Sequence, residues 1–400
     1  MSFIRFYVFN AFIIFAFTAC KVENNGNNLI SLSEPESLAL TLTDIAEDVT
    51  YVRLSSKIPI QHIHHLEVID DNIFISCHPE MIVRFDLNGN LLGEIGKKGR
   101  GPQDYERTLS FTLDYTNKHV IVLSNNFTLK FYDFSGEYVK TISLKNISDF
   151  SEVSMLKEGL ILLTRGNPYG NAKFNWIILD IDGKIIDTKE NHVKFNLSTN
   201  IALNPSQITC KFQRKIIYYE SFNDTIFAID QNHYVPQFIF ERDQYRMTSQ
   251  RFISETPKWI NEVDRSRLKK PEKKYYHIRT LFMTTKYFWI GYSLDYYSQL
   301  ALIDNKTNEL YTIYDSGENS GLLNDYDGGL SFFPESYFEK NNSEFLCSWI
   351  NSLQIKGHIF SRVFKSTIPQ YPEKKKELEK LANNLNENDN PVLMLVKLKE

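Results

Sequence analysis

A glycine-rich basic segment is the first stretch of this sequence that could do chemistry. It contains four glycines and three cations, namely Gly93, Gly96, Lys97, Lys98, Gly99, Arg100 and Gly101. A phosphate-binding P-loop needs Ser or Thr directly after its Gly-Lys pair, whereas Lys98 follows Gly96-Lys97 here. We therefore interpret the segment as a tight backbone connection, because glycine adopts conformations that other residues avoid.

Three side chains at the end of this segment suit the binding of a solute. Arg100 offers a planar fork of donors for a carboxylate, Tyr105 offers an aromatic surface for a sugar, and Asp104 adds a charge. We predict these three as ligand contacts if the segment faces the central channel of a ring-shaped fold. The alternative is a purely structural connection with Arg100 directed into solvent.

Paired carboxylates suggest hydrolysis, and the acidic pairs are Asp70 with Asp71 and Asp325 with Asp327. Glycosidases hold two carboxylates about 5 to 9.5 Å apart, a separation that sequence spacing does not report. Turn chemistry explains Asp-Gly-Gly at residues 327–329 equally well. We predict no catalytic residue, but retain Asp325 and Asp327 as ligand contacts that ring closure would bring beside the glycine-rich segment.

Histidines and cysteines are the candidate metal ligands of the sequence. His62 and His64 would share one face of a strand, but no third ligand follows at a useful spacing, so we predict no metal and no other cofactor. The cysteines that follow residue 20 are Cys77, Cys210 and Cys347. An odd number this widely spaced is no disulfide framework, which leaves either three buried thiols or one long-range bridge with one free thiol.

The first twenty residues predict export and lipidation. After Arg5, an apolar run from Phe6 to Phe17 has the length of a signal-peptide core and is shorter than a membrane-spanning helix. Ala19-Cys20 resembles a bacterial lipobox, which makes residues 1–19 a lipoprotein signal peptide and Cys20 the lipidation site. An ordinary secretory signal is the alternative. We expect a lipid anchor in the cell envelope, at the outer membrane, with the membrane face left open.

Composition favours an all-β protein that does not bind nucleic acid. The chain of 400 residues has a formal net charge of -4 and no domain-sized basic region. Its 29 Phe and 22 Tyr favour pleated, half-buried surfaces over helices.

A repeated turn organises the elements that must position the candidate residues. An apolar run, an Asp and a turn recur at Asp86, Asp133, Asp180, Asp230 and Asp304, with steps of 47, 47, 50 and 74 residues. A unit of about 40 to 50 residues with four short strands is a propeller blade. The length available predicts a six-bladed β-propeller, and seven blades fit less well.

The long last step predicts an insertion, which we place at 242–275 as a helical segment between blades 4 and 5. Near the C-terminus, leucines at helical spacing predict a helix over 372–386, and an apolar run predicts a closing strand over 391–398. The closing strand should pair with residues 49–54, which removes exposed sheet edges. We thus divide the chain into the signal peptide, a lipidated linker over 20–45 and a propeller over 46–400.

The first predicted hairpin and its continuation carry a family resemblance. Phe85-Asp86-Leu87-Asn88-Gly89 leads into the segment from Gly93 to Tyr105, and this stretch is similar to the six-bladed β-propeller lipoproteins of Bacteroidetes. Weaker similarity lies at 222–226, 325–329 and 388–393. Gln103 stands where the family pattern has glycine. The resemblance implies a fold and an envelope location, and it supplies no catalytic residues.

Together these features predict an envelope-anchored propeller that acts as a binding or protein-interaction module, with a glycan, a nutrient or a protein as its partner. The alternative is a polysaccharide lyase or hydrolase with its site in the channel. A cluster of channel groups with perturbed pKa values would favour the enzyme, whereas a wide apolar or aromatic rim would favour binding. Neither the ligand nor the oligomeric state follows from the sequence.

Overall fold

The computed structural model describes residues 29–32, 40–147, 150–167, 169–195, 207–213, 215–231, 233–241, 245–251, 253–254, 275–294, 297–313 and 321–400. Cys20 and most of the predicted insertion at 242–275 therefore lie outside the described residues. Residues 249–251 and 253–254, near the start of that insertion, are helical.

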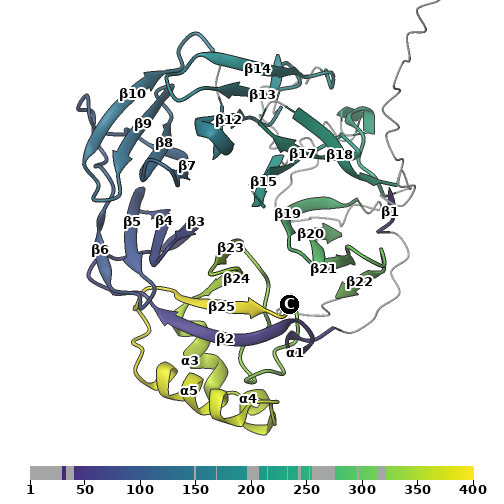
Figure 1. Cartoon of the computed structure of the whole chain (residues 1–400). Helices are drawn as coiled ribbons and strands as arrows, with labels where there is room; N and C mark the ends of the chain where they lie inside the picture. Colours follow the sequence, from purple (N-terminus) through teal and green to yellow (C-terminus); the bar gives the residue numbers. More distant parts are fainter. Residues whose placement is uncertain are drawn as a thin grey trace, which may run out of the picture.

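Six sheets surround a central axis, and the strands of each blade are counted from the innermost outward (Figure 1). Blade 1 contains β3 (His62–Ile69), β4 (Asn72–His78), β5 (Met81–Asp86) and β6 (Leu91–Glu94). Blade 2 contains β7 (Thr108–Asp114), β8 (His119–Ser124), β9 (Thr128–Asp133) and β10 (Tyr138–Ser143). Blade 3 contains β11 (Glu152–Met155), β12 (Ile161–Thr164), β13 (Phe174–Leu179) and β14 (Ile185–Glu190).

The second half of the ring repeats this plan. Blade 4 contains β15 (Gln207–Phe212), β16 (Lys215–Glu220), β17 (Thr225–Asp230) and β18 (His233–Phe240). Blade 5 contains β19 (His277–Met283), β20 (Tyr287–Leu294), β21 (Tyr297–Asp304) and β22 (Leu310–Ile313). Blade 6 contains β23 (Ser336–Lys340), β24 (Ser343–Ile350), β25 (Val392–Leu398) and, outermost, β2 (Ala46–Arg53). The predicted six-bladed β-propeller is confirmed.

Blade 6 joins the two ends of the chain. β2 pairs antiparallel with β25, and Val49 lies opposite Val396 while Val52 lies opposite Leu393. β2 lies near the start of the chain and β25 at its end. Their pairing therefore closes the ring and leaves no open seam between the first and last parts of the chain.

Central strands of the blades are apolar on both faces because each blade packs between two others. In β4, Ile73, Phe74 and Ile75 are all fully buried. The outer strand β6 instead alternates half-buried and exposed positions. Continuous apolar runs in the middle of a blade and alternation at its rim therefore follow from position in the ring.

The repeated Asp has a local structural role in the hairpins that end the first three blades. Oδ1 of Asp86 accepts hydrogen bonds from the amide nitrogens of Asn88 and Asn90, at 2.9 and 2.8 Å. Asp133 and Asp180 accept from the amides two and four residues further on. The 47-residue repeat thus reports an Asp-dependent turn at one fixed place in each blade.

Glycines in these hairpins bring neighbouring blades together. Gly89 and Gly136 have positive φ angles of 81° and 94°. A Cβ at Gly89 would lie 2.1 Å from the carbonyl oxygen of Arg53 in blade 6, and one at Gly136 would lie 2.3 Å from that of Glu94 in blade 1. Each glycine therefore permits both the turn and a close approach to the outer strand of the preceding blade.

Two additions cover outer edges of the ring. β1 (Leu29–Ile30) pairs in parallel with β18, as a fifth strand of blade 4. Between β24 and β25 the chain forms α3 (Ser352–Phe360), α4 (Arg362–Ser366) and α5 (Pro372–Asn383), which lie outside blade 6 (Figure 1). Nζ of Lys374 reaches Asp48 Oδ1 at 2.8 Å, so α5 lies against the edge of β2.

Only the last of these helices is a sequence prediction, and it ends at Asn383 rather than at 386. A further short helix, α1 (Leu42–Ile45), precedes β2. The three cysteines are buried and unpaired, which matches the interpretation as thiols. Burial raises the pKa of the Cys77 and Cys210 thiols to about 12.

Candidate functional site

The two ends of the ring differ in the length of their connections. At one end, the hairpins between first and second strands and between third and fourth strands contain two to five residues. At the other end the chain crosses from blade to blade, and long connections, by number of residues, run from β6 to β7, from β18 to β19 and from β22 to β23. We call this the crossover end. Because longer connections carry more variable side chains on a rigid scaffold, it is the natural place for a site.

The glycine-rich segment forms the crossover from β6 to β7, and Asp104 holds it together. Its Oδ2 accepts a hydrogen bond from the amide of Gly101 at 3.0 Å. A Cβ at Gly99 would lie 2.3 Å from the same oxygen. The glycines and Asp104 are thus explained by close packing within the loop.

Tyr105 is a buried part of the scaffold. Its side chain is 1% exposed, and its hydroxyl oxygen accepts a hydrogen bond from the amide of Ile82 at 3.3 Å. Its ring meets that of Tyr132 edge to face, with centroids 6.1 Å apart. Burial raises the pKa of Tyr105 well above its ordinary value. The ring is not available at the surface as an aromatic surface for a sugar.

Arg100 points into solvent. Its side chain is 92% exposed, and the nearest carboxylate, that of Glu106, lies 3.9 Å from Nε. Arg100 and Tyr105 therefore do not converge on one point, although Arg100 remains a predicted contact for a ligand at the surface.

Asp325 and Asp327 lie on the connection from β22 to β23, at the outer side of blade 6. Asp325 accepts hydrogen bonds from the amide and hydroxyl of Thr43 and from the hydroxyl of Thr41. Asp327 is 1% exposed and accepts from the amide of Gly329 at 2.8 Å. Both carboxylates are engaged with their own loop or with the segment before β2, and the structure does not bring them to the glycine-rich crossover.

A cluster of basic side chains at the crossover end was not predicted. We call it the basic patch, and it consists of His62, His64, His78, Lys98 and Arg107. Glu80, in the turn between β4 and β5, receives both cations: Lys98 Nζ lies 2.5 Å from its Oε2 and Arg107 Nε lies 3.1 Å from its Oε1. The lysine side chain remains 53% exposed and the arginine 62%.

The histidines of the patch come from two paired strands. His62 and His78 are opposite partners in β3 and β4, and the rings of His62 and His64 are 5.1 Å apart. The pairing skips His64, which forms a bulge between Ile63 and His65. Bulges re-aim side chains and recur beside functional sites. His62 and His64 were noted in the sequence, but the strand register that adds His78 was not visible there.

Inside the channel, Glu67 on β3 pairs with Lys211 on β15, and the distance from Nζ to Oε2 is 2.6 Å. Blades 1 and 4 are opposite in a ring of six, so this ion pair crosses the channel. Thr112 also accepts from Lys211, at 2.8 Å. Nε2 of His65 lies 3.4 Å from Oε1 of the same glutamate.

The electrostatics of this pair keep both groups charged. Burial raises the pKa of Glu67, but Lys211 and His65 outweigh it and lower that pKa to about 2. Burial lowers the pKa of Lys211, but Glu67 and Tyr115 outweigh it and raise that pKa. A general acid or base needs a pKa near the working pH, so the pair is better suited to bracing the ring than to proton transfer.

Two other carboxyls, on or directly before innermost strands, are perturbed in the opposite direction. Burial raises the pKa of Glu152, against hydrogen bonds from Thr209 and Gln207. The protein atoms around Glu335, directly before β23, raise its pKa to about 7, but the residue is exposed, so solvent weakens this effect. Within the described ranges, no three His, Cys, Asp or Glu side chains are arranged to hold a metal ion.

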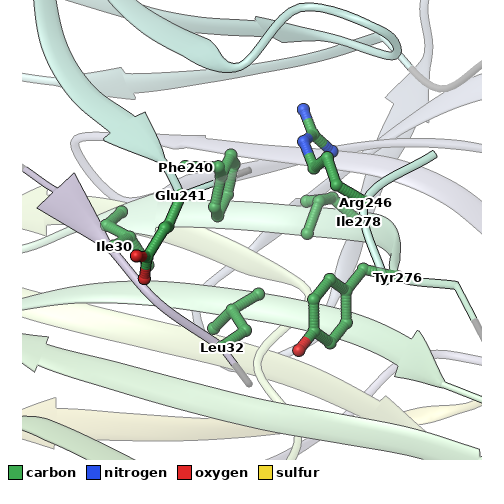
Figure 2. Close-up of a pocket in the computed structure, with 7 residues that line it drawn as sticks. All are labelled: Ile30, Leu32, Phe240, Glu241, Arg246, Tyr276 and Ile278. Carbon is green, nitrogen blue, oxygen red and sulfur yellow. The ribbon is translucent and has the colours of Figure 1, made fainter. Parts of the chain in front are cut away.

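A narrow crevice lies where the segment around β1 meets blades 4 and 5 (Figure 2), lined by Ile30, Leu32, Phe240, Glu241, Arg246, Tyr276 and Ile278. The guanidinium of Arg246 is engaged: it donates to Asp224 Oδ1 at 2.8 Å, to the Asn223 carbonyl oxygen at 2.6 Å and to the Tyr219 hydroxyl at 3.2 Å. With Arg246 only 4% exposed, the crevice is a packing seam at the start of the insertion.

A family profile described as a domain of unknown function, DUF4934, matches residues 28–397. The chain belongs to the DUF4934 family. A search of curated proteins finds no match. Among the helices that the structure describes, none is long and apolar enough to cross a membrane.

Two solved structures similar to this DUF4934 protein differ in how well they match, and only a match with a TM-score above 0.5 bears on the fold. A candidate exported protein from Bacteroides fragilis is 19% identical, with a TM-score of 0.69, and the alignment covers 93% of this chain and 100% of that one. A virginiamycin B lyase from Staphylococcus aureus is 14% identical, with a TM-score of 0.41 over 75% of this chain and 81% of that one. At these identities the likeness concerns the fold alone.

Proposed function

We propose that this DUF4934 protein is a lipid-anchored binding module of the cell envelope, and that its ligand or partner binds at the crossover end. The observation that carries the proposal is the contrast between the two ends of the ring: short hairpins at one, and long crossovers with an exposed basic patch at the other. A rigid ring that presents long connections at one end suits recognition.

The lipid anchor is supported by the lipobox around Cys20, and export is in keeping with the description of the Bacteroides fragilis relative in fold. Metabolic labelling with an acyl-chain probe tests the anchor. Cys20→Ala should abolish the label and release the protein from the membrane fraction. A label that survives the substitution would refute the anchor.

Binding is tested with the mature lipoprotein in detergent against an array of glycans and small metabolites. Any ligand found is then titrated against two matched variants. Lys98→Gln alters the crossover end, whereas Lys118→Gln alters an equally exposed lysine, 52% against 53%, that pairs with Asp70 at the hairpin end. We expect only Lys98→Gln to weaken binding. A ligand whose affinity depends on Lys118 and not on Lys98 would place the site at the hairpin end and contradict the proposal.

An enzyme is the second candidate, and the raised pKa values of Glu152 and Glu335 favour it. Glu335 is exposed to substrate, and a raised pKa suits a general acid at neutral pH. The test is an incubation with polysaccharides followed by analysis for shortened products. Glu335→Gln should abolish cleavage if the carboxyl acts as the acid. An unchanged rate in that variant would remove Glu335 from the reaction.

A further inference from the structure

The basic patch has the charge and geometry of an anion site. Lys98 and Arg107 share a single carboxylate, Glu80, so the three groups leave one positive charge in excess. Arg107 keeps donors beyond its Nε contact, because a guanidinium carries five N–H groups. Both cations are more than half exposed, and an incoming anion can therefore reach them.

Three histidines extend this cation pair toward the channel. His62, His64 and His78 are all exposed, and His62 and His64 lie edge to face. When neutral, each imidazole offers one donor and one acceptor, and when protonated it offers two donors and a positive charge. Each protonated imidazole therefore adds one donor and one positive charge to the patch.

The groups that act on His64 come from each neighbouring element. Burial lowers its pKa first, followed by His62 on the same strand, His78 on β4 and Arg107 on the crossover, while Glu80 in the β4–β5 turn opposes them. The next residue, His65, lies close to Glu67 on the same strand. In blade 6, Glu335 directly precedes β23. Burial, and after it the positive charges around the ring, thus favour the neutral form of His64.

From this arrangement we propose that the basic patch binds an anionic glycan, one that carries carboxylate or sulfate groups, and that binding is accompanied by proton uptake at His64. The proposal rests on the proposed function and names its ligand class. A single small anion would compete with Glu80 for the same two cations. A chain with repeated negative groups gains several contacts at once and reaches from the crossover to the histidines.

The direction of the pH dependence follows from linkage. A bound anion stabilises the protonated imidazoles, so it raises the pKa of His64 above its value in the free protein. Affinity should therefore rise as the pH falls toward the pKa of His64 in the free protein, which lies below the ordinary histidine value of 6.5. Each histidine whose pKa rises by about one unit on binding contributes about a tenfold gain in affinity at low pH.

Calorimetric titration of the mature lipoprotein tests the proposal with three probes: oligogalacturonate for carboxylate, chondroitin sulfate oligosaccharides for sulfate, and neutral dextran. We expect one or both anionic probes to bind about tenfold more tightly at pH 5.5 than at pH 7.5 and dextran to show no binding. Titrations in buffers of different ionisation enthalpy should show net proton uptake.

Variants locate the site. Arg107→Gln should weaken binding about thirtyfold at both pH values, as expected for a central anchor, and His64→Gln should reduce the pH dependence and the proton uptake. Lys118→Gln at the hairpin end should change neither. Circular dichroism checks that each variant is folded.

The possible outcomes separate this inference from the proposed function. Anionic glycans that bind without pH dependence, or equally well to Arg107→Gln, overturn the inference. The inference is also overturned if a neutral glycan, a nucleic acid or a protein binds at the crossover end and anionic glycans do not. That result would leave the proposed binding module intact. Binding confined to the hairpin end contradicts both.

Discussion

Breaking the ion pair that crosses the channel should cost far more than breaking a surface pair. In Lys211→Met, the carboxylate of Glu67 stays 8% exposed but loses the partner that holds it 2.6 Å away. The folded pKa of Glu67 is about 2 and its ordinary value is 4.5, and a displacement of this size corresponds to about 3 kcal/mol of stability, which Lys211 and His65 provide together. We expect the loss of Lys211 to remove the larger part of this from the free energy of unfolding at pH 7.

The sign of the pH dependence follows from the lowered pKa. A carboxyl whose pKa is lower in the folded state stabilises the fold at pH values above its unfolded pKa, and this contribution is lost as the pH falls toward the folded pKa. The difference between the wild-type protein and Lys211→Met should therefore be greatest at pH 7 and should shrink as the pH falls below about 4.5.

Urea unfolding followed by tryptophan fluorescence and circular dichroism measures the difference at pH 7 and pH 4. Lys340→Met is the matched control, because its side chain is also 26% exposed but pairs with Asp71, which is 80% exposed. Such a pair contributes about 0.5 kcal/mol or less. Equal losses in the two variants, or a loss in Lys211→Met that does not shrink at pH 4, would refute the reasoning.

Further predictions concern the scaffold, with urea midpoints as the measurement unless stated. Gly136→Ala should destabilise by about 1 to 3 kcal/mol, because it forces a side chain onto a positive φ and the neighbouring blade, whereas Gly357→Ala, with open space around it in α3, should stabilise by about 0.5 to 1 kcal/mol. Tyr105→Phe should cost about 1 kcal/mol, by removing the acceptor for the Ile82 amide, and should leave ligand affinity unchanged. A thiol reagent at pH 8 should label no cysteine of the described fold before the protein unfolds, because burial raises the pKa of these thiols, Cys77, Cys210 and Cys347.

The fold could be predicted because its repeat is local. The turn at Asp86 depends on residues two and four further on, and the turns at Asp133 and Asp180 copy it at a spacing of 47 residues. Such short-range chemistry is visible in a sequence, and blade number follows from its period. The fifth strand of blade 4 was missed because β1 contains only two residues, Leu29 and Ile30, and its partner lies about 210 residues away.

The candidate site was harder to predict because packing and ligand binding favour the same residue types. Asp104 and Tyr105 stand beside glycines as binding residues do, yet one closes the loop and the other fills the core. The basic patch depends on the register of β3 and β4, including the bulge at His64, and on the path of the crossover that brings Arg107 to Glu80. None of these is set by local sequence.

Blade 6 is built from both ends of the chain, and this sets the order in which the fold can form. Its outer strand β2 belongs to residues 46–53, whereas its pairing partner β25 is made only after residue 391. During synthesis β2 therefore has no partner until nearly the whole chain exists, and the ring cannot close on a shortened product. Pairing across so long a separation in sequence is intrinsically slow. We therefore expect closure of the ring to be the last step of folding.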